Sequence, residues 1–340
     1  MDNPATHNHA IETFAFAFAD AAELAVVERG GFVESRHGGS AVVLGPDGTV
    51  TRSIGDPGGI IFPRSSLKPF QAVAVLSSGV ALDGAAAALA TASHAGTPAH
   101  IAVVRSMLAQ AALPESALHC TADWPLDRDA RDDLVRAGIG AAPLYMNCSG
   151  KHASMLLACV KNGWPLESYL DPRHPLQLQV RDVVERLTGE KIAATAVDGC
   201  GAPIHAISLT GLARGIHRIT TASASSPFAL YRNAALLTKA VLNNGWAIDG
   251  PGRANTVVID KLGVFTKGGA EGVMIMAAPD GTTVALKMLD GSARAATIVA
   301  LALLAQAGAI DASAPDSLAA ELGLDVLGGG KPVGRIRATI

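Results

Sequence analysis

Residues 63–71 read PRSSLKPFQ and stand where one kind of sequence pattern gives way to another. Before them, over residues 24–55, short apolar runs flank Pro46-Asp47-Gly48, which is typical of a β-hairpin. After them, up to about residue 245, apolar residues recur at the i, i+3, i+4 spacing of helices. Pro69 fits this boundary, because a proline in the first turn of a helix costs no hydrogen bond. We therefore expect strands to end and a helical region to begin here.

The rest of the chain extends this pattern. Helices are predicted at residues 66–78, 84–92, 99–112, 127–137, 151–161, 175–188, 204–215 and 227–243. Strands are then predicted at 256–260, 263–266, 273–278 and 284–288, followed by a helix at 293–307. Because strands occupy both ends, the sequence predicts an α+β fold with one sheet built from N- and C-terminal strands. The expected single unit, 1–340, has its sheet region at 24–64 and 246–310 and its helical lobe at 65–245.

Composition narrows the class of protein. Of the 340 residues, 49% are hydrophobic and 17% charged, so the chain can bury a sizeable core. A net charge of -3 and only 4% aromatic residues argue against nucleic acid binding. No apolar run reaches the roughly 18 residues of a membrane span. Residues 1–10 are polar and lack the basic start of a signal peptide, so we expect a cytoplasmic protein with reduced cysteines.

The first motif with a chemical meaning is Ser65-Ser66-Leu67-Lys68. At the start of a helix, side chains three residues apart share one face, so Ser65 and Lys68 would lie together. A serine hydroxyl needs a base to become a nucleophile, and a lysine serves as that base if desolvation or a nearby cation lowers its pKa. The alternative is that Ser65 is only a helix N-cap, because Ser-x-x-Lys is common by chance.

Two further segments carry the same residue types. Ser93-His94-Ala95-Gly96 could extend into a cleft, or it could end a helix with Gly96 in the left-handed conformation. Lys267-Gly268-Gly269 lies between predicted strands, where it could approach a ligand or simply form a hairpin loop. An early Ser-x-x-Lys followed by a Lys-x-Gly on a late strand resembles the penicillin-recognising serine hydrolases.

Two glycine-rich turns each contain a cysteine at a predicted helix start. They are residues 147–152, NCSGKH, and residues 198–203, DGCGAP. Cys148 and Cys200 could share a metal ion, although this is a weaker signal than paired C-x-x-C motifs. The alternative is that both segments only open helices.

Together these segments, in this order, resemble the Rhizobium etli-type L-asparaginases. The resemblance rests on residues 64–71, 93–96, 147–152, 198–203 and 267–272. Connecting stretches are also similar, namely residues 29–37, 124–127 and 169–172, and the resemblance covers roughly residues 24–310. It implies a fold like that of serine β-lactamases and glutaminases, a homodimer, and hydrolysis of L-asparagine to L-aspartate and ammonia.

The resemblance also implies roles for single residues. Ser65 matches the nucleophile and Lys68 its partner, and Ser93 with Lys267 matches a second Ser-Lys pair. The residues that match the ligands of a zinc ion are Cys148, Lys151 and Cys200. Those that match the surroundings of the reaction centre are Arg64, His152 and Asp198. We expect the oxyanion to be held by backbone N–H groups of Ser65 and of the strand near Gly268.

The chain departs from the family pattern at Thr97, where glutamate is common, and at Asn255, where aspartate is common. Both departures bear on substrate specificity more than on the class of reaction. Two other functions fit the same residues. One is an amidase of the penicillin-binding type. The other is a zinc-binding or sensing protein with a vestigial hydrolase site. A lysine ligand must lose its proton to bind zinc, so metal occupancy should fall at low pH.

Overall fold

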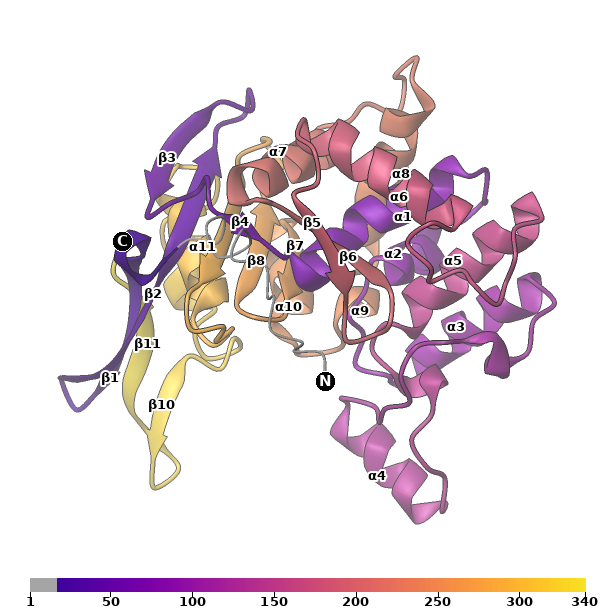
Figure 1. Ribbon diagram of the computed structural model, residues 1–340. Coiled ribbons are helices and arrows are strands. Elements are labelled where there is room, and N and C mark those ends of the chain that lie inside the picture. The colour runs from indigo at the N-terminus through magenta and orange to yellow at the C-terminus, as the bar shows by residue number, and fades with distance from the viewer. Residues whose placement is uncertain (1–16) are drawn as a thin grey trace, which may run out of the picture.

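The computed structural model describes residues 17–340, and the polar segment 1–10 lies outside them. The chain has the predicted α+β fold, with a sheet on one side and a helical lobe on the other (Figure 1). The strand order of the main sheet is β10-β11-β1-β2-β9-β8-β7, with β3 paired to β2, and all its pairings are antiparallel. Its strands are β1 (Ala22–Arg29), β2 (Phe32–Leu44), β3 (Val50–Ile54), β7 (Phe265–Gly269), β8 (Val273–Ala277), β9 (Thr283–Met288), β10 (Asp325–Gly328) and β11 (Lys331–Ala338).

The lobe holds most of the helices and a small second sheet. The small sheet consists of β4 (Ile60–Ile61), β5 (Ala194–Val197) and β6 (Pro203–Ser208). The helices are α1 (Lys68–Ser77), α2 (Gly84–Ala90), α3 (Pro98–Gln110), α4 (Arg128–Arg136), α5 (Ser149–Asn162), α6 (Pro175–Thr188), α7 (Leu209–Thr220), α8 (Ala229–Asn243), α9 (Gly245–Ile248), α10 (Ala254–Leu262), α11 (Ala296–Gln306) and α12 (Ala314–Ser317). None of the helices within residues 17–340 is long and apolar enough to cross a membrane.

The main sheet separates two hydrophobic cores. Successive side chains of a strand point to opposite faces, and in β2 Val42 and Leu44 join the core of the helical lobe. Their neighbours Ala41 and Val43 join a second core, formed with α11 on the other face. The sheet is therefore the middle of three layers. This explains why its central strands are apolar on both faces and lack a polar alternation.

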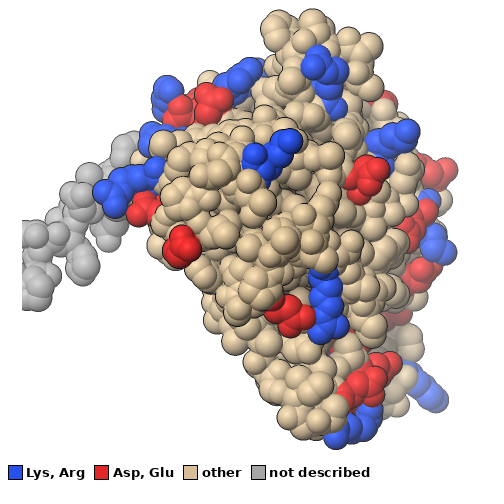
Figure 2. All heavy atoms as spheres, turned by 90° about the vertical axis from the view of Figure 1, so that its right-hand side faces the viewer, with Lys and Arg blue, Asp and Glu red and all other residues tan. Residues whose placement is uncertain are grey.

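Helix α1 is central to the lobe, since each of its residues from Lys68 to Leu76 is buried. It packs against α6, α8 and α5, and the 3-10 turn Arg64–Leu67 leads into it from β4. The motif that opens α1 is therefore fixed in the middle of the molecule. Figure 2 shows the outer face of the lobe, where lysine and arginine alternate with acidic residues and gather into no basic patch.

Two segments differ from the predicted secondary structure. The helix predicted at 204–215 is β6 followed by α7, and the break falls at Ser208, whose hydroxyl accepts a hydrogen bond from the Gly211 N–H as the N-cap of α7. The strand predicted at 256–260 is part of α10. Its β-branched residues are buried, and tertiary packing outweighs their preference for strands. The sheet also extends past the predicted limit of residue 310, through β10 and β11.

Candidate active site

Ser93 lies in a loop between α2 and α3 that belongs to no helix or strand. Its backbone N–H donates to the carbonyl of Ile248 at 3.0 Å, and the N–H of Ala95 donates to the carbonyl of Asp249 at 2.6 Å. The loop is thus bound by its backbone to a segment more than 150 positions further along the chain. Such bonds fix the position of a serine that no regular element carries.

The loop is not the end of a helix, since α2 already ends at Ala90. Gly96 does adopt the left-handed conformation, with φ at 78°. A Cβ atom at this position would also lie 3.1 Å from the Cα of Pro125. Glycine is therefore required by both conformation and packing. The close approach fixes the end of the Ser93 loop against the segment that leads to α4.

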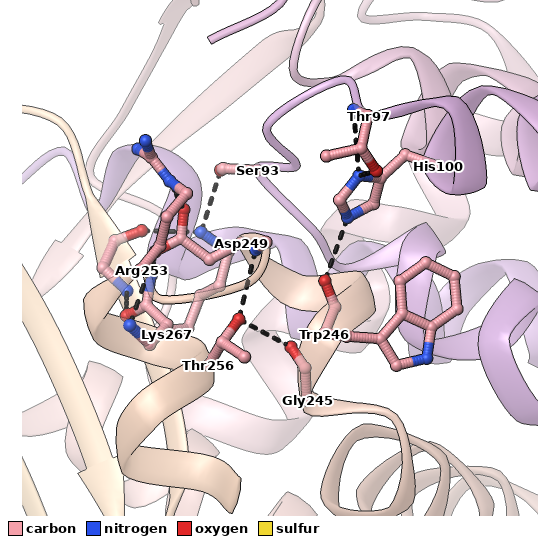
Figure 3. Close-up of polar contacts among 12 residues, drawn as sticks. Ser93, Thr97, His100, Gly245, Trp246, Asp249, Arg253, Thr256 and Lys267 are labelled. Atoms are coloured by element: carbon pink, nitrogen blue, oxygen red, sulfur yellow. Dashed lines mark hydrogen bonds and ion pairs between the residues drawn. The ribbon is translucent and has the colours of Figure 1, made fainter. Parts of the chain in front are cut away.

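The Ser93 hydroxyl lies between two lysine amines. Lys68 Nζ is 2.8 Å from Ser93 Oγ. Lys267 Nζ lies 2.9 Å from the same oxygen (Figure 3). Both lysines are only 1% exposed, whereas Ser93 is half-buried and open to a ligand. Each amine also donates to a carbonyl, Lys68 to Ala92 and Lys267 to Gly268, both at 2.6 Å. The structure thus brings three of the four predicted catalytic residues together around one oxygen.

The charge of Lys267 is weakened by its surroundings. Burial, followed by the nearby charge of Lys68, lowers the pKa of Lys267 to about 7, while Asp249 and Cys148 oppose the shift. A lysine with this pKa is partly neutral at physiological pH and can accept a proton. The low value places Lys267 among groups suited to general acid–base chemistry.

Ser65 precedes Lys68 by three residues, in the turn that leads into α1. It follows Arg64 in the 3-10 turn, and its hydroxyl has no hydrogen-bond partner among residues 17–340. Arg64 adopts a left-handed conformation with φ at 51°, and its Nε donates to Asp198 Oδ1 at 2.8 Å. Glu271, with φ at 59°, places a carboxylate oxygen 3.7 Å from the same guanidinium. Strained non-glycine residues of this kind are concentrated at functional sites.

The Ser-x-x-Lys turn packs directly on the edge strand β7. Ser66 Oγ donates to the carbonyl of Lys267 at 3.1 Å. A Cβ atom on Gly269 would lie only 2.7 Å from the carbonyl oxygen of Pro63, so no larger residue fits between strand and turn. Two motifs 200 positions apart in the sequence are therefore in contact.

The Gly268 N–H, which we expected to serve the oxyanion, already has a partner. It donates to Asn255 Oδ1 at 3.1 Å. Asn255 Nδ2 in turn donates to Asp249 Oδ2 at 2.9 Å. Arg253 Nε lies 2.5 Å from Asp249 Oδ1 (Figure 3). Asp249 is a residue of this network that no sequence motif predicts. Its only local signal is a carboxylate at the start of a Gly-Pro-Gly turn.

Thr97 is the other position that departs from the family pattern. It caps α3, and its hydroxyl lies 2.7 Å from His100 Nδ1. His100 Nε2 lies 2.9 Å from the carbonyl of Trp246 (Figure 3). The Thr97 side chain thus serves as the N-cap of α3, at the point where the Ser93 loop ends.

The predicted zinc ligands also lie together. Lys151 Nζ donates to Cys200 Sγ at 3.0 Å. A hydrogen bond from the Cys200 thiol holds the pKa of Cys148 well below its usual value, and the same contact raises the pKa of Cys200. Burial opposes a charge on Lys151, but the two thiols outweigh burial and raise the pKa of this lysine. One thiolate beside an ammonium is therefore the favoured state of the cluster.

His152 adjoins this cluster. Its Nδ1 lies 2.7 Å from the Tyr169 hydroxyl, and its buried Nε2 has no hydrogen-bond partner among residues 17–340. Burial, followed by the charge of Lys151, lowers the pKa of His152 to about 4, so the ring is neutral. Two thiols and an amine form a donor set that suits zinc, and the His152 ring adjoins them without completing a group of three His and Cys ligands. Within residues 17–340, no group of three or more His, Cys, Asp or Glu side chains could hold a metal, so Lys151 would have to be a ligand.

Comparison with known proteins identifies the family of the chain. The sequence model of the L-asparaginase II family matches residues 25–338. One similar solved chain, described as "Crystal Structure Analysis of Mglu in its glutamate form", is 14% identical, with a TM-score of 0.37 over 79% of this chain and 60% of that chain. This chain therefore spans less than two thirds of that one. No curated protein matches. Because the family match covers nearly the whole chain, the chain belongs to the L-asparaginase II family, a family of amide hydrolases that act on small molecules.

Proposed function

We propose that this protein hydrolyses the side-chain amide of L-asparagine, giving L-aspartate and ammonia, through an acyl-enzyme on Ser65. The observation that carries the proposal is the Ser93 hydroxyl held between Lys68 and Lys267. Such an arrangement can accept a proton from a nucleophile and return it to a leaving group.

Lys68 is the base in this proposal. When the proton that the two lysines share through Ser93 lies on Lys267, the Lys68 amine is neutral and has two N–H bonds and one lone pair. Its contacts with Ala92 and Ser93 use both N–H bonds. Its lone pair is then left to accept the proton of Ser65, which precedes it by three residues at the start of α1. Attack by Ser65 on the amide carbon forms the new C–O bond, and the proton moves to Lys68 Nζ.

The proton then returns to the leaving group. Lys68 can give it directly to the amide nitrogen. Alternatively, Lys267 gives its own proton to that nitrogen and regains one from Lys68 through the Ser93 hydroxyl. The bond between carbon and nitrogen then breaks to release ammonia. Water attacks the resulting ester and gives up a proton to the same lysines. The bond between the acyl carbon and Ser65 Oγ then breaks, Oγ regains a proton from Lys68, and aspartate is released. The low pKa of Lys267 allows it to hold and release a proton at neutral pH.

We also propose that Cys148, Lys151 and Cys200 hold a zinc ion. When bound there, zinc supplies a positive charge that can grip an anionic part of the substrate or order the turns before α5 and β6. Asp198, which pairs with Arg64 and adjoins Cys200, would connect this cluster to the Ser65 turn.

Ser93 is a second candidate for the nucleophile. It is favoured by its direct contacts with both amines, whereas the Ser65 hydroxyl has no partner among the described residues. In that case Lys68 and Lys267 would both act on Ser93, and Ser65 would contact the substrate.

The test is ammonia release from L-asparagine and L-glutamine by wild type, Ser65→Ala and Ser93→Ala, with mass spectrometry of acid-quenched enzyme. Loss of a nucleophile should lower turnover by several orders of magnitude. An acyl adduct on the Ser65 peptide supports the proposal, and one on the Ser93 peptide transfers the role. Wild type that binds zinc but releases no ammonia would instead support a zinc-binding protein, and acylation by a β-lactam would support an amidase of penicillin-binding type.

A further inference from the structure

Asn255 makes polar contacts on both sides of its carboxamide. Oδ1 accepts the Gly268 N–H at 3.1 Å, and Nδ2 donates to Asp249 Oδ2 at 2.9 Å. Asn255 is buried, only 9% exposed, and stands at the start of α10. Only one orientation of the amide satisfies both neighbours, because the N–H group requires an acceptor and the carboxylate requires a donor.

A carboxylate at position 255 would not satisfy the same neighbours. It could accept the Gly268 N–H, but it would place a second negative charge against Asp249. Arg253 is the guanidinium that pairs with Asp249, and it does so through Nε. The neutral amide of Asn255 therefore suits both neighbours: it donates to one carboxylate through Nδ2 and accepts from a backbone N–H through Oδ1.

The contact with Gly268 bears directly on Lys267. Gly268 is the next residue, and its carbonyl accepts a hydrogen bond from Lys267 Nζ at 2.6 Å. Strand β7 is at the edge of the sheet and is paired on one side only, with β8. Beyond that pairing, the Lys267-Gly268 peptides are held by Ser66 Oγ and by Asn255.

We infer that Asn255 is a positioning residue for the amide hydrolysis proposed above: by joining Asp249 to the Gly268 N–H, it holds the edge strand so that Lys267 reaches Ser93. The inference rests on the proposed function for its kinetic consequence. Its geometric part, the Asn255–Gly268 hydrogen bond, stands independently of the substrate. Asn255 acts through Lys267 and does not itself contact the reacting atoms.

The kinetic test uses Asn255→Ala, Asn255→Asp and the reciprocal double variant Asp249→Asn/Asn255→Asp. Each single change at Asn255 should lower kcat for L-asparagine about 10–100-fold with little change in KM, because small misplacements of a reacting group have effects of this size. In the double variant the amide at 249 can donate to the carboxylate at 255 and still accept from Arg253. It should therefore regain kcat to within about fivefold of wild type.

A matched control is Asn233→Asp on α8, where the side chain contacts Ser77 and lies outside the site. Its kcat should equal that of wild type. Urea unfolding of every variant separates lost stability from lost positioning. A purely structural role would let the single variants keep kcat in their folded fraction, and rescue by the reciprocal pair would then be absent.

A second readout needs no substrate. Lys267-Gly268 is the only Lys-Gly pair in the sequence, so labelling lysine with ¹³C at the carbonyl and glycine with ¹⁵N gives one HNCO signal, that of the Gly268 amide. Loss of its acceptor in Asn255→Ala should shift this proton upfield and speed its exchange with solvent at least tenfold. The signal should return to its wild-type position in the reciprocal pair.

Three results would overturn the inference. They are wild-type kcat in Asn255→Ala, an unmoved Gly268 signal in the same variant, and a reciprocal pair no better than Asn255→Asp alone. If wild type releases no ammonia from L-asparagine, the proposed function fails and the Gly268 signal alone decides whether Asn255 holds β7. The two failures are therefore distinguishable.

Discussion

At the scale of the residue, Lys267 couples the site to pH. Its pKa of about 7, which burial and Lys68 produce, means that it loses its proton in the physiological range. If its neutral form takes part in turnover, kcat should rise with pH through an inflection near 7. The measurement is the pH profile of ammonia release. Lys267→Met should remove this inflection along with most activity, and a wild-type rate independent of pH between 6 and 8 would contradict the role.

The same shift predicts the pH dependence of folding. The unfolded chain keeps the ordinary lysine pKa of about 10.4, so between pH 7 and 10 it binds a proton that the folded protein does not. The contribution of Lys267 to stability therefore increases as pH rises through this window. Urea unfolding at pH 7 and 9 should show a smaller gain in Lys267→Met than in wild type. An equal gain would mean that Lys267 is not the group responsible.

Arg64 combines an unfavourable backbone conformation with an ion pair, and two substitutions separate them. Both Arg64→Ala and Arg64→Gly lose the contact with Asp198, but glycine adopts the left-handed conformation without the cost of a Cβ atom. We expect Arg64→Gly to be more stable than Arg64→Ala by about 1 kcal/mol and both to lose activity. Equal unfolding midpoints in urea would show that the turn relaxes once the ion pair is removed.

The predicted catalytic residues came from the sequence more readily than their contacts. Each of the motifs that contain Ser65, Lys68, Ser93 and Lys267 is weak alone, and the order of several motifs along the chain is what indicated them together. Their catalytic roles stay predictions. Asp249 contributes through a turn that approaches β7 only in the folded chain. No spacing within its own segment could indicate that contact.

At the scale of the element, helix bounds were predicted correctly where the sequence contains recognisable helix-capping residues. Helix α6 was predicted at its observed bounds, because Pro175 marks its first position and Gly189, with φ at 76°, lies just past its end. The segment around Ser208 has an apolar pattern that fits strand or helix, so only pairing with β5 and β4 assigns β6 to a sheet.

The contact between β7 and the Ser65 turn predicts the effect of a single methyl group. Gly269→Ala would place a Cβ atom 2.7 Å from the Pro63 carbonyl, which is backbone and cannot rotate away. We expect a loss of about 1–3 kcal/mol in unfolding free energy and reduced kcat, since the strand must move away from the turn. Gly140→Ala, where nothing lies within 4 Å, is the matched control. Wild-type stability in Gly269→Ala would mean that strand and turn do not pack this closely.

The cysteine cluster joins two elements, the start of α5 and the turn before β6. If zinc binds there, the purified protein should contain about one zinc per chain, and Cys200→Ala should lose it. Because Lys151 and the thiols must be deprotonated to bind, occupancy should fall as pH is lowered. Cys159→Ala, in the core of α5, should keep its zinc. Metal analysis that finds zinc in neither wild type nor Cys159→Ala would exclude the site.

At the scale of the whole molecule, the sheet depends on both ends of the chain. Strand β11 pairs with β1, with Ala25 opposite Ala338 and Val27 opposite Ile336. Deleting residues 325–340 should leave the edge of β1 unpaired, lower the urea midpoint and promote aggregation. Light scattering and circular dichroism measure both effects. Unchanged behaviour would show that β1 is stable without this partner. The homodimer implied by the family stays a prediction that sedimentation velocity can test.

The prediction that N- and C-terminal strands form one sheet is confirmed, but the sheet also contains two strands that were not predicted. Early and late strands do share one sheet, as their order along the chain indicated. The final pair β10 and β11 was missed because Gly328 to Gly330 and Pro332 interrupt its apolar pattern, and residues 331–338 alternate only weakly.

The pairing of β1 with β11 also places the start of one beside the end of the other, with the Thr339 N–H donating to the Leu24 carbonyl at 3.0 Å. A short peptide could join these two points, and the chain could be opened instead at the turn Pro46-Asp47-Gly48. In such a circular permutant the Ser65 turn, the Ser93 loop and β7 would keep their order relative to one another. Strands β1 and β2 would then be synthesised last, after the strands β9 and β11 with which they pair, and they would close a sheet whose other strands already carry the site.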